Sequence, residues 1–511
     1  MLITSPPRSP STSSSSPLFE SPSSTSLLSP FIPTQEQKRA YLWPNAELVV
    51  TNNIFAFPEH RIDPRTLYPV QRVTVVCDNV EFVRCWDLTL SGLVLQYLIG
   101  IPNSWSLDIL RLGFAEAGCA KLPIVLHLFV GLEPEDPLLA VQLALQIIQD
   151  VTDMISMNWQ GERIYIDVCR PHFCSIFDTL ALLSLSIKGL SNTPAGNYTR
   201  SPPFPGSSIG QRDPTGQTGH SGTLSGYVKH EDDFYALTAH HVLPYGCGTL
   251  AESPSPTDHK SVKETLQQDI GNLAPGSIVK KVVDFVPSLF SKSSTPLNFW
   301  LKIWNDSKNW DPELGTITYH STGKELHGFD WCLTKIEGLK KGRNYNRHIP
   351  YNYYDPSSGF QHGAVQGFPP ADITLAKAYF APGPAFKPVR TTFIAGGEIC
   401  LKTPSRTMRE WTIGSVNTIR TYTQSRPHGV PFTLYCIVST TTGMAFSREG
   451  DSGAIILDKD FQPVAMVQSG EEAWNGYPDI THAMDLASVL TNVEEVNNWD
   501  KGSAVFCSGG D

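Results

Sequence analysis

The chain has 511 residues, of which 41% are hydrophobic and 17% are charged, and its formal net charge is −10. At roughly 100–200 residues per domain, this length fits about two to four domains, and the hydrophobic share is enough for a sizeable core. The negative charge disfavours a general nucleic-acid binder, because phosphate backbones would be repelled. An apolar stretch at residues 88–107 is interrupted by Pro, Asn, Gln and Ser, so we expect no membrane span.

Cysteine usage and the N-terminus indicate where the protein is found. Ten cysteines are spread along the chain, which is ordinary usage rather than that of a disulfide scaffold. The first residues lack the positively charged and apolar regions of a secretory signal. Together these features predict an intracellular protein, cytoplasmic or nuclear, with free thiols.

One cluster, Cys169, His172 and Cys174, could form half of a zinc site. A closed structural zinc site needs four ligands, and no second pair follows at a suitable spacing. Free cysteines and a packed histidine are therefore the preferred interpretation, and we expect neither a metal nor an organic cofactor.

Composition divides the chain into a series of segments. Residues 1–38 are predicted to be disordered, because Ser, Pro and Thr make up 23 of the first 35 residues. Residues 39–190 show a mixed α/β pattern, and residues 191–218, rich in Pro, Gly, Ser and Thr, are predicted to be a linker. A β-rich segment, residues 219–490, and a C-terminal tail, residues 491–511, complete the chain.

Apolar runs at residues 73–77, 122–130 and 164–168 predict strands within the α/β segment. Asp136 followed by Pro137 is typical of a helix start, and the apolar residues after it repeat at helical spacing. The order strand, helix, strand predicts a layered α/β module. It carries no phosphate loop and no Gly-rich dinucleotide motif, so its function and its partner stay open.

Short strands bounded by Gly and Pro dominate the second half, which is typical of a barrel or sandwich. Residues 221–228 and 233–238 predict a hairpin. Residues 257–273 carry apolar side chains at helical spacing and predict a helix inserted between strands. Further strands are predicted at residues 315–319, 412–417 and 432–438.

Three short motifs of this β-rich segment supply the residue types of nucleophilic catalysis. They are Thr-Ala-His-His ending at His241, Asp-Trp-Cys-Leu starting at Asp330, and Gly-Asp-Ser-Gly around Ser452. Each alone is compatible with a structural role as a strand end with solvated histidines, a strand-start carboxylate or a β-turn. Together and in this order they favour catalysis.

The three residue types form a complete catalytic set. A serine hydroxyl is a weak nucleophile at neutral pH and needs an adjacent base. A neutral imidazole can take its proton and return it to the leaving group, while a buried carboxylate fixes the imidazole tautomer. Backbone N–H groups must also face the oxyanion, and a Gly two residues before the serine permits the required backbone angles.

With these motifs the β-rich segment resembles the chymotrypsin-like serine peptidases of the PA clan, and with the N-terminal module it resembles fungal serine-peptidase-like proteins. The resemblance implies a mainly β fold of two β-barrels and an endopeptidase that cleaves proteins or peptides through an acyl-enzyme. It implies that His241 is the base, Asp330 the orienting acid and Ser452 the nucleophile. The N–H groups of Gly450 and Ser452 would form the oxyanion hole, and His240 is a rival for the role of base.

The spacing and the cysteine pattern depart from that family. The separations of 89 residues between His241 and Asp330 and of 122 between Asp330 and Ser452 exceed those of compact members. The first gap must therefore hold an insertion. Cysteines that secreted members carry near the base and the nucleophile are replaced by Val242 and Arg448, which agrees with an intracellular protein.

The usual activation switch of the family is also missing. No Ile-Val-Gly-Gly sequence follows a basic cleavage site, so no new terminal amine is expected to pair with Asp451. Asp451 therefore needs another partner.

The resemblance places the primary substrate pocket at Phe446 and at Gln468, Ser469 and Gly470. None of these offers a carboxylate to pair with Lys or Arg, and a bulky Phe would shorten the pocket. We expect a preference for small or medium uncharged side chains at the cleaved residue. The alternative function is a catalytically inactive, peptidase-like binding or regulatory protein that acts through its N-terminal module.

Overall fold

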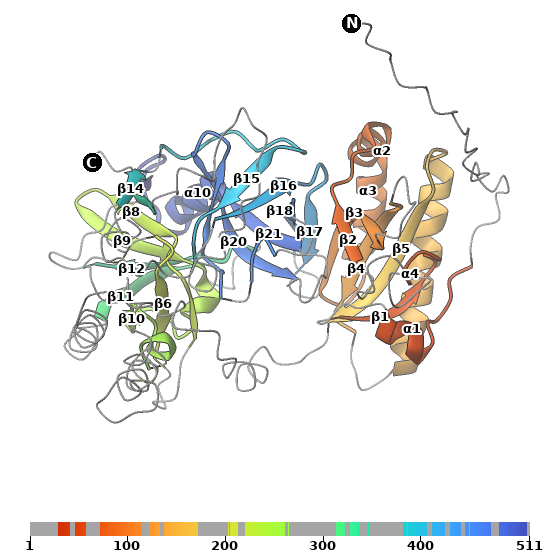
Figure 1. The fold of residues 1–511 in the computed structure, drawn as a ribbon, viewed down its shortest axis with the longest axis horizontal. Helices are drawn as coiled ribbons and strands as arrows, with labels where there is room; N and C mark the ends of the chain where they lie inside the picture. The colour runs from red at the N-terminus through yellow and green to blue at the C-terminus, as the bar shows by residue number, and fades with distance from the viewer. Residues whose placement is uncertain are drawn as a thin grey trace, which may run out of the picture.

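The computed structural model shows an α/β module at one end of the molecule and a β-barrel assembly at the other (Figure 1). The predicted tail and the predicted linker lie largely outside the residues that the structure describes. The described residues are 29–40, 46–57, 72–114, 122–132, 137–171, 203, 205–212, 220–260, 264, 313–321, 328–336, 345–347, 382–385, 387–405, 411–424, 430–440, 445–448, 450–471 and 480–507.

The N-terminal module is built on a sheet with the strand order β1-β5-β4-β3-β2. β4 and β5 pair in parallel and are connected through the long helix α4, so the predicted strand–helix–strand unit is confirmed. The remaining pairs in this sheet are antiparallel. The strands are β1 (Ala46–Thr51), β2 (Arg72–Val75), β3 (Trp105–Phe114), β4 (Ile124–Val130) and β5 (Ile164–Pro171).

Helices pack against this sheet and form a shared core with it. The helical elements are α1 (Gln35–Ala40), α2 (Val80–Cys85), the π-helical turn η1 (Trp86–Leu90), α3 (Ser91–Ile99) and α4 (Pro137–Asn158), and all of them except α1 contribute side chains to this core. α4 begins at Pro137, as predicted, whereas the predicted cap Asp136 lies outside the described residues. By length and composition Val80–Ile99 and Pro137–Asn158 could each cross a membrane, but both contribute buried side chains to this core.

The first barrel contains strands β6 to β12 in the order β8-β9-β12-β11-β10-β6-β7. β7 and β8 are two parts of one bent segment and are separated by Leu224 and Ser225. Because β7 pairs with β6 and β8 pairs with β9, this bent segment closes the sheet. The strands are β6 (Ser208–Gln211), β7 (Ser221–Thr223), β8 (Gly226–His230), β9 (Asp233–Thr238), β10 (Leu250–Glu252), β11 (Glu313–His320) and β12 (Cys332–Lys335).

The second barrel follows the order β18-β16-β15-β19-β20-β21, and β21 pairs back onto β18. α10 (Leu486–Asn497) follows β21, and β22 (Val505–Phe506) then returns to pair with β8 of the first barrel. A separate hairpin is formed by β13 (Tyr345–Arg347) and β14 (Pro382–Ala385). The strands of the barrel are β15 (Ile399–Lys402), β16 (Thr412–Val416), β18 (Phe432–Ser439), β19 (Ile455–Asp458), β20 (Pro463–Glu471) and β21 (Ile480–Asp485).

Two consecutive β-barrels behind an α/β module are the chymotrypsin-like architecture that the motifs predict, so the predicted fold class is confirmed. The predicted hairpin is formed by β8 and β9. The helix predicted at residues 257–273 is seen in part: residues 256–260 are helical, and most of residues 261–273 lie outside the described residues.

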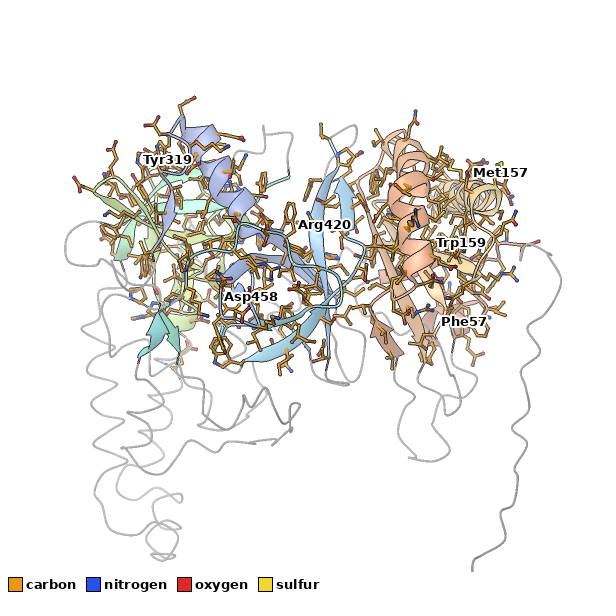
Figure 2. All side chains as sticks on the ribbon, turned by 90° about the horizontal axis from the view of Figure 1, so that it is seen from above. Phe57, Met157, Trp159, Tyr319, Arg420 and Asp458 are labelled. Atoms are coloured by element: carbon orange, nitrogen blue, oxygen red, sulfur yellow. The ribbon has the colours of Figure 1, made fainter. Side chains whose placement is uncertain are left out.

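The module and the second barrel are joined by a continuous sheet. β17 (Thr421–Gln424) pairs with β18 on one side and with β3 of the module on the other. Figure 2 shows Arg420 at this junction. Residues of both parts share one buried cluster, which includes Leu110 and Leu112 from the module and Val438 and Ile480 from the barrel. The α/β module is therefore packed onto the barrel through backbone pairing and apolar contacts.

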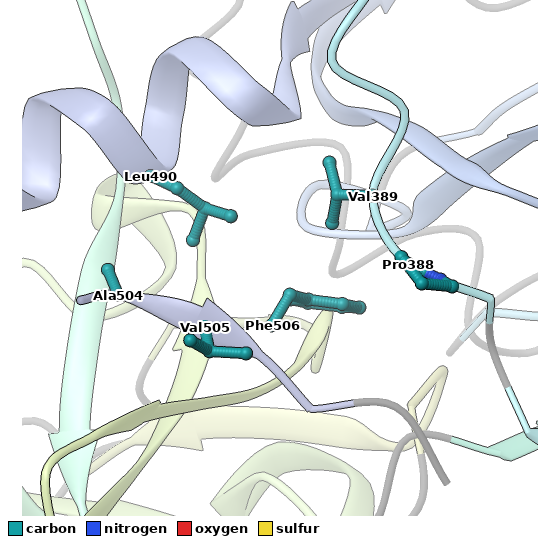
Figure 3. A pocket seen from close by; sticks show the side chains of 6 residues that line it. All are labelled: Pro388, Val389, Leu490, Ala504, Val505 and Phe506. Carbon is teal, nitrogen blue, oxygen red and sulfur yellow. The ribbon is translucent and has the colours of Figure 1, made fainter. Parts of the chain in front are cut away.

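A small apolar pocket lies beside α10 and β22 (Figure 3). Its volume is about 240 Å³. None of the predicted site residues lines it. Its lining residues are Pro388, Val389, Leu490, Ala504, Val505 and Phe506.

Candidate active site

His241 lies on a short turn that directly follows strand β9. The turn is the 3₁₀ helix η4 (His240–Val242), and Val242 anchors it in the core of the first barrel. The Nδ1 atom of His241 lies 2.5 Å from Oδ2 of Asp330, and the backbone N–H of His241 donates to Oδ1 at 3.0 Å. One carboxylate therefore fixes both the ring and the backbone of the predicted base.

Asp330 reaches this position because β12 pairs with β9. Cys332 lies opposite Thr238 in that pair, which places the residues before β12 beside the end of β9. Trp331 is fully buried and donates its indole N–H to the side-chain oxygen of Asn492 of α10 at 2.8 Å. The motif Asp-Trp thus combines the carboxylate that contacts His241 with an anchor in the core.

The His241–Asp330 pair shifts the pKa of both partners. Burial lowers the pKa of His241, but the hydrogen bond and the charge of Asp330 outweigh it, and the net shift is upward. Burial raises the pKa of Asp330, and the hydrogen bonds and charge of His241 reverse this to a net downward shift. Asp330 is therefore held as a carboxylate next to an imidazole that binds protons more tightly than usual.

His240, the rival base, has a different partner. Its ring stacks on His320 with the centroids 4.5 Å apart and an interplanar angle of 11°. Burial and the neighbouring His320 lower its pKa. The two neighbouring histidines lie on one 3₁₀ turn and contact different partners. Only His241 is bonded to Asp330.

Ser452 lies on a tight turn that leads into β19. Its Oγ donates to the carbonyl oxygen of Gln468 on β20 at 3.2 Å. Although both side chains are described, no hydrogen bond joins Oγ to the His241 ring. A Cβ on Gly222 would lie 2.4 Å from Val242 and 3.1 Å from the carbonyl oxygen of Ser452, so the turn of the base and the turn of the serine meet around this glycine.

The serine turn is held against the bent segment of the first barrel. The N–H of Thr223 donates to the carbonyl of Ser452 at 2.9 Å, and its hydroxyl donates to the carbonyl of Gly450 at 2.8 Å. The Ser225 hydroxyl donates to the carbonyl of Gly453 at 2.5 Å. These bonds fix the predicted nucleophile at the junction of the two barrels.

Two glycines permit the path of this turn. Gly450 has φ +87°, and the N–H of Asp451 closes the turn on the carbonyl of Arg448 at 2.9 Å. Gly453 has φ +92°, and a Cβ there would lie 2.2 Å from the carbonyl oxygen of Thr223. Within the described chain, no acceptor takes the N–H of Gly450 or Ser452, so both predicted oxyanion donors are unoccupied.

Asp451 has a partner that the sequence did not reveal. Nζ of Lys402, at the end of β15, lies 3.1 Å from Oδ2 of Asp451, and both side chains are fully buried. The Ser405 hydroxyl also donates to Asp451, and the Arg448 N–H donates to it at 3.0 Å. Lys402 therefore supplies a positive charge beside Asp451, whose partner the sequence left open. The sequence signal was only a lysine at the end of an apolar strand.

The predicted pocket residues lie on two segments. Phe446 is fully buried in the core of the second barrel, in the same cluster as Val416 and Ile437. Gln468, Ser469 and Gly470 lie on β20. A Cβ on Gly470 would lie 2.8 Å from the carbonyl oxygen of Ile480, which shows how closely β20 and β21 approach here.

No metal cluster forms among the described residues: no group of three or more His, Cys, Asp or Glu side chains could hold an ion there. Cys169 lies buried on β5 and forms no disulfide, and the rest of the predicted half-site, His172 and Cys174, lies outside the described residues.

Among the comparisons with known proteins, only the one with solved structures found matches. No family model matches the sequence, and no curated protein matches it at a significant level. Solved structures that match include a glutamic-acid-specific serine protease (10% identity, TM-score 0.30, 57% of this chain and 97% of the other), Thermobifida fusca protease A (12%, 0.28, 57% and 95%) and Cellulomonas bogoriensis chymotrypsin (12%, 0.28, 57% and 94%). These likenesses are weak, and the architecture rests on the strand pairing described above.

Proposed function

We propose that the protein is a serine endopeptidase in which Ser452 is the nucleophile, His241 the base and Asp330 the orienting acid. The observation that carries the proposal is the contact between Asp330 and His241. One carboxylate accepts a hydrogen bond from the backbone N–H of His241 and contacts Nδ1 of its ring. This leaves Nε2 as the ring atom that can exchange a proton with a hydroxyl.

The reaction would proceed in two halves. Ser452 Oγ turns from the Gln468 carbonyl towards His241, attacks the scissile carbonyl carbon and gives its proton to Nε2. The imidazolium returns that proton to the leaving amine as the C–N bond breaks, which produces the acyl-enzyme and the first product. Water then attacks the ester in the same way and releases the acid.

The oxyanion of each tetrahedral intermediate would be stabilised by the N–H groups of Gly450 and Ser452. The Lys402–Asp451 pair supports this role, because it fixes the residue between the two donors without any cleavage of the chain. Donors that are already oriented stabilise the developing charge without a reorganisation cost at the moment of reaction.

Labelling with a fluorophosphonate tests the proposal. The wild-type chain should be labelled at Ser452, and Ser452→Ala should abolish labelling and lower peptide turnover by about 10⁴-fold or more. Ser156→Ala is the matched control, because Ser156 is an exposed serine of α4 that bonds only to its own helix. Equal labelling of wild type and Ser452→Ala would refute the proposal.

The second candidate is a catalytically inactive, peptidase-like binding protein. It is favoured by one observation: the Ser452 hydroxyl bonds to Gln468 and not to His241. A folded wild-type chain that resists labelling would support this function. We also propose that the protein is intracellular, since none of the eight cysteines of the described residues forms a disulfide.

A further inference from the structure

A buried carboxylate of the N-terminal module reaches into the second barrel. Asp108, on β3, has no exposed surface, and Nε2 of His482 on β21 lies 3.1 Å from each of its carboxylate oxygens. The Thr421 hydroxyl of β17 donates to the same carboxylate. Asp108 therefore contacts β21 of the second barrel and β17, the strand through which the module joins the barrel.

His482 continues this contact to the strand that holds the predicted pocket. Its Nδ1 lies 3.5 Å from the hydroxyl of Ser469, which is opposite it in the β20–β21 pair. The residue before Ser469 is Gln468, whose carbonyl accepts the Ser452 hydroxyl at 3.2 Å. Two side chains thus connect the module with the strand that contacts the nucleophile.

Asp108 can orient the His482 ring because it remains charged. Burial raises its pKa, but the charge and hydrogen bond of His482, the Thr421 hydroxyl and the charge of His127 outweigh burial and lower it. A carboxylate bonded to Nε2 sets the direction of the whole ring, since Nδ1 then faces Ser469.

Asp108 also ends a row of buried polar residues that crosses the module. His127 lies opposite it on β4, Asp167 follows on β5 and Thr51 on β1, and all four are fully buried. Apolar residues would fill these positions at a lower desolvation cost. The row is nevertheless polar, and Asp108 at its end is the member that contacts His482.

We propose that Asp108 is a positioning residue for the peptidase site: by holding His482 against β20, it fixes the strand that carries the pocket wall and the acceptor of the Ser452 hydroxyl. The α/β module is then a part of the catalytic unit. This inference rests on the proposed function for its kinetic readout, and a second readout is independent of activity.

The test compares Asp108→Asn with Glu162→Gln in the full chain. Glu162 bonds Arg111, which lies on the same strand as Asp108 but three residues further on and thus on the other face of the sheet. Asp108→Asn should raise KM for a peptide substrate by about tenfold, because a displaced pocket wall misplaces the substrate. Labelling of Ser452 by a small fluorophosphonate, which does not fill the pocket, should change by less than about threefold. Glu162→Gln should lower stability and leave KM unchanged.

A double variant tests the path through His482. His482→Gln should raise KM as Asp108→Asn does. The KM of the double variant should be no higher than that of either single variant, because both substitutions break the same connection. Additive effects would overturn the proposal, as would an unchanged KM in Asp108→Asn.

Hydrogen exchange keeps the proposal testable if the wild type proves inactive. Asp108→Asn should increase deuterium uptake in Pro463–Glu471, and Glu162→Gln should not. A wild type that resists labelling would refute the peptidase function alone. Unchanged uptake in β20 would refute the role of Asp108 whatever the activity.

Discussion

His240 and His241 are neighbours with different partners, and substitution can test which of them is the base. Because only His241 is bonded to Asp330, His241→Ala should lower kcat by about 10⁴-fold or more, whereas His240→Ala removes a ring stacked on His320 and should cost less than about tenfold. Steady-state kinetics of both variants against one peptide ester would check this. The reverse ranking would move the base to His240.

The pH profile should report the raised pKa of His241. A base must be neutral to accept a proton, so kcat/KM should fall as the pH drops through a pKa above the ordinary value of 6.5. Asp330→Asn removes the charge that raises this pKa, so the acidic limb should move to lower pH while the maximal rate falls. An acidic limb that stays in place in Asp330→Asn would contradict the assignment of Asp330.

Lys402 should be required for an ordered serine turn. Lys402→Met leaves Asp451 as a buried charge without its cation, which typically costs about 3–5 kcal/mol. We expect a clear drop in the free energy of unfolding and a loss of labelling at Ser452. Lys459→Met, at an exposed lysine after β19, is the control and should change neither. Wild-type labelling of Lys402→Met would show that the serine turn orders without this pair.

Among single residues, the sequence pointed to those candidate site residues that lie in a short local motif. The segments around His241, Asp330 and Ser452 can be recognised because each is a short run of characteristic residues. Lys402 could not be recognised, since its pairing with Asp451 depends on β15 lying next to β19 in the sheet. Asp108 was missed for the same reason: its partner lies 374 residues further along the chain.

Among the elements, the serine turn depends on the bent segment of the first barrel. Gly453→Ala should abolish activity and destabilise the fold, because a Cβ would lie 2.2 Å from a carbonyl oxygen of Thr223 and the residue has φ +92°. Gly502→Ala is the control: it has φ +82°, but a Cβ there meets nothing within 4 Å. Both variants place a side chain at a positive φ, but only Gly453→Ala adds a clash. Gly453→Ala should therefore have the lower melting temperature of the two. Equal melting temperatures would show that the turn can move to accept a side chain.

Local sequence patterns predicted several individual strands and the long helix of the module. They did not predict where a strand bends or which strands pair. Residues 221–228 were predicted as one strand, and the structure divides them at Leu224 and Ser225 so that one segment serves both ends of a sheet. The pairing of β3 with β17 joins segments about 300 residues apart, and no periodicity within either segment encodes it.

For the whole molecule, the composition of residues 191–218 predicts a linker, and the parts before and after it share a sheet and a core. Removing the module would leave β17 as an open edge and uncover apolar side chains such as Val438 and Ile480. Open edges and apolar patches promote association between chains.

A chain truncated to residues 203–511 should therefore be less soluble, elute as higher oligomers in size-exclusion chromatography and melt at a lower temperature than the full chain. A chain that lacks only residues 1–28 is the control and should match the full chain in all three measurements. If the truncated barrels are monomeric and match the full chain in KM for a peptide substrate and in deuterium uptake of β20, the junction is dispensable. In that case neither the shared core nor Asp108 can support the catalytic unit, because both would have been removed without effect.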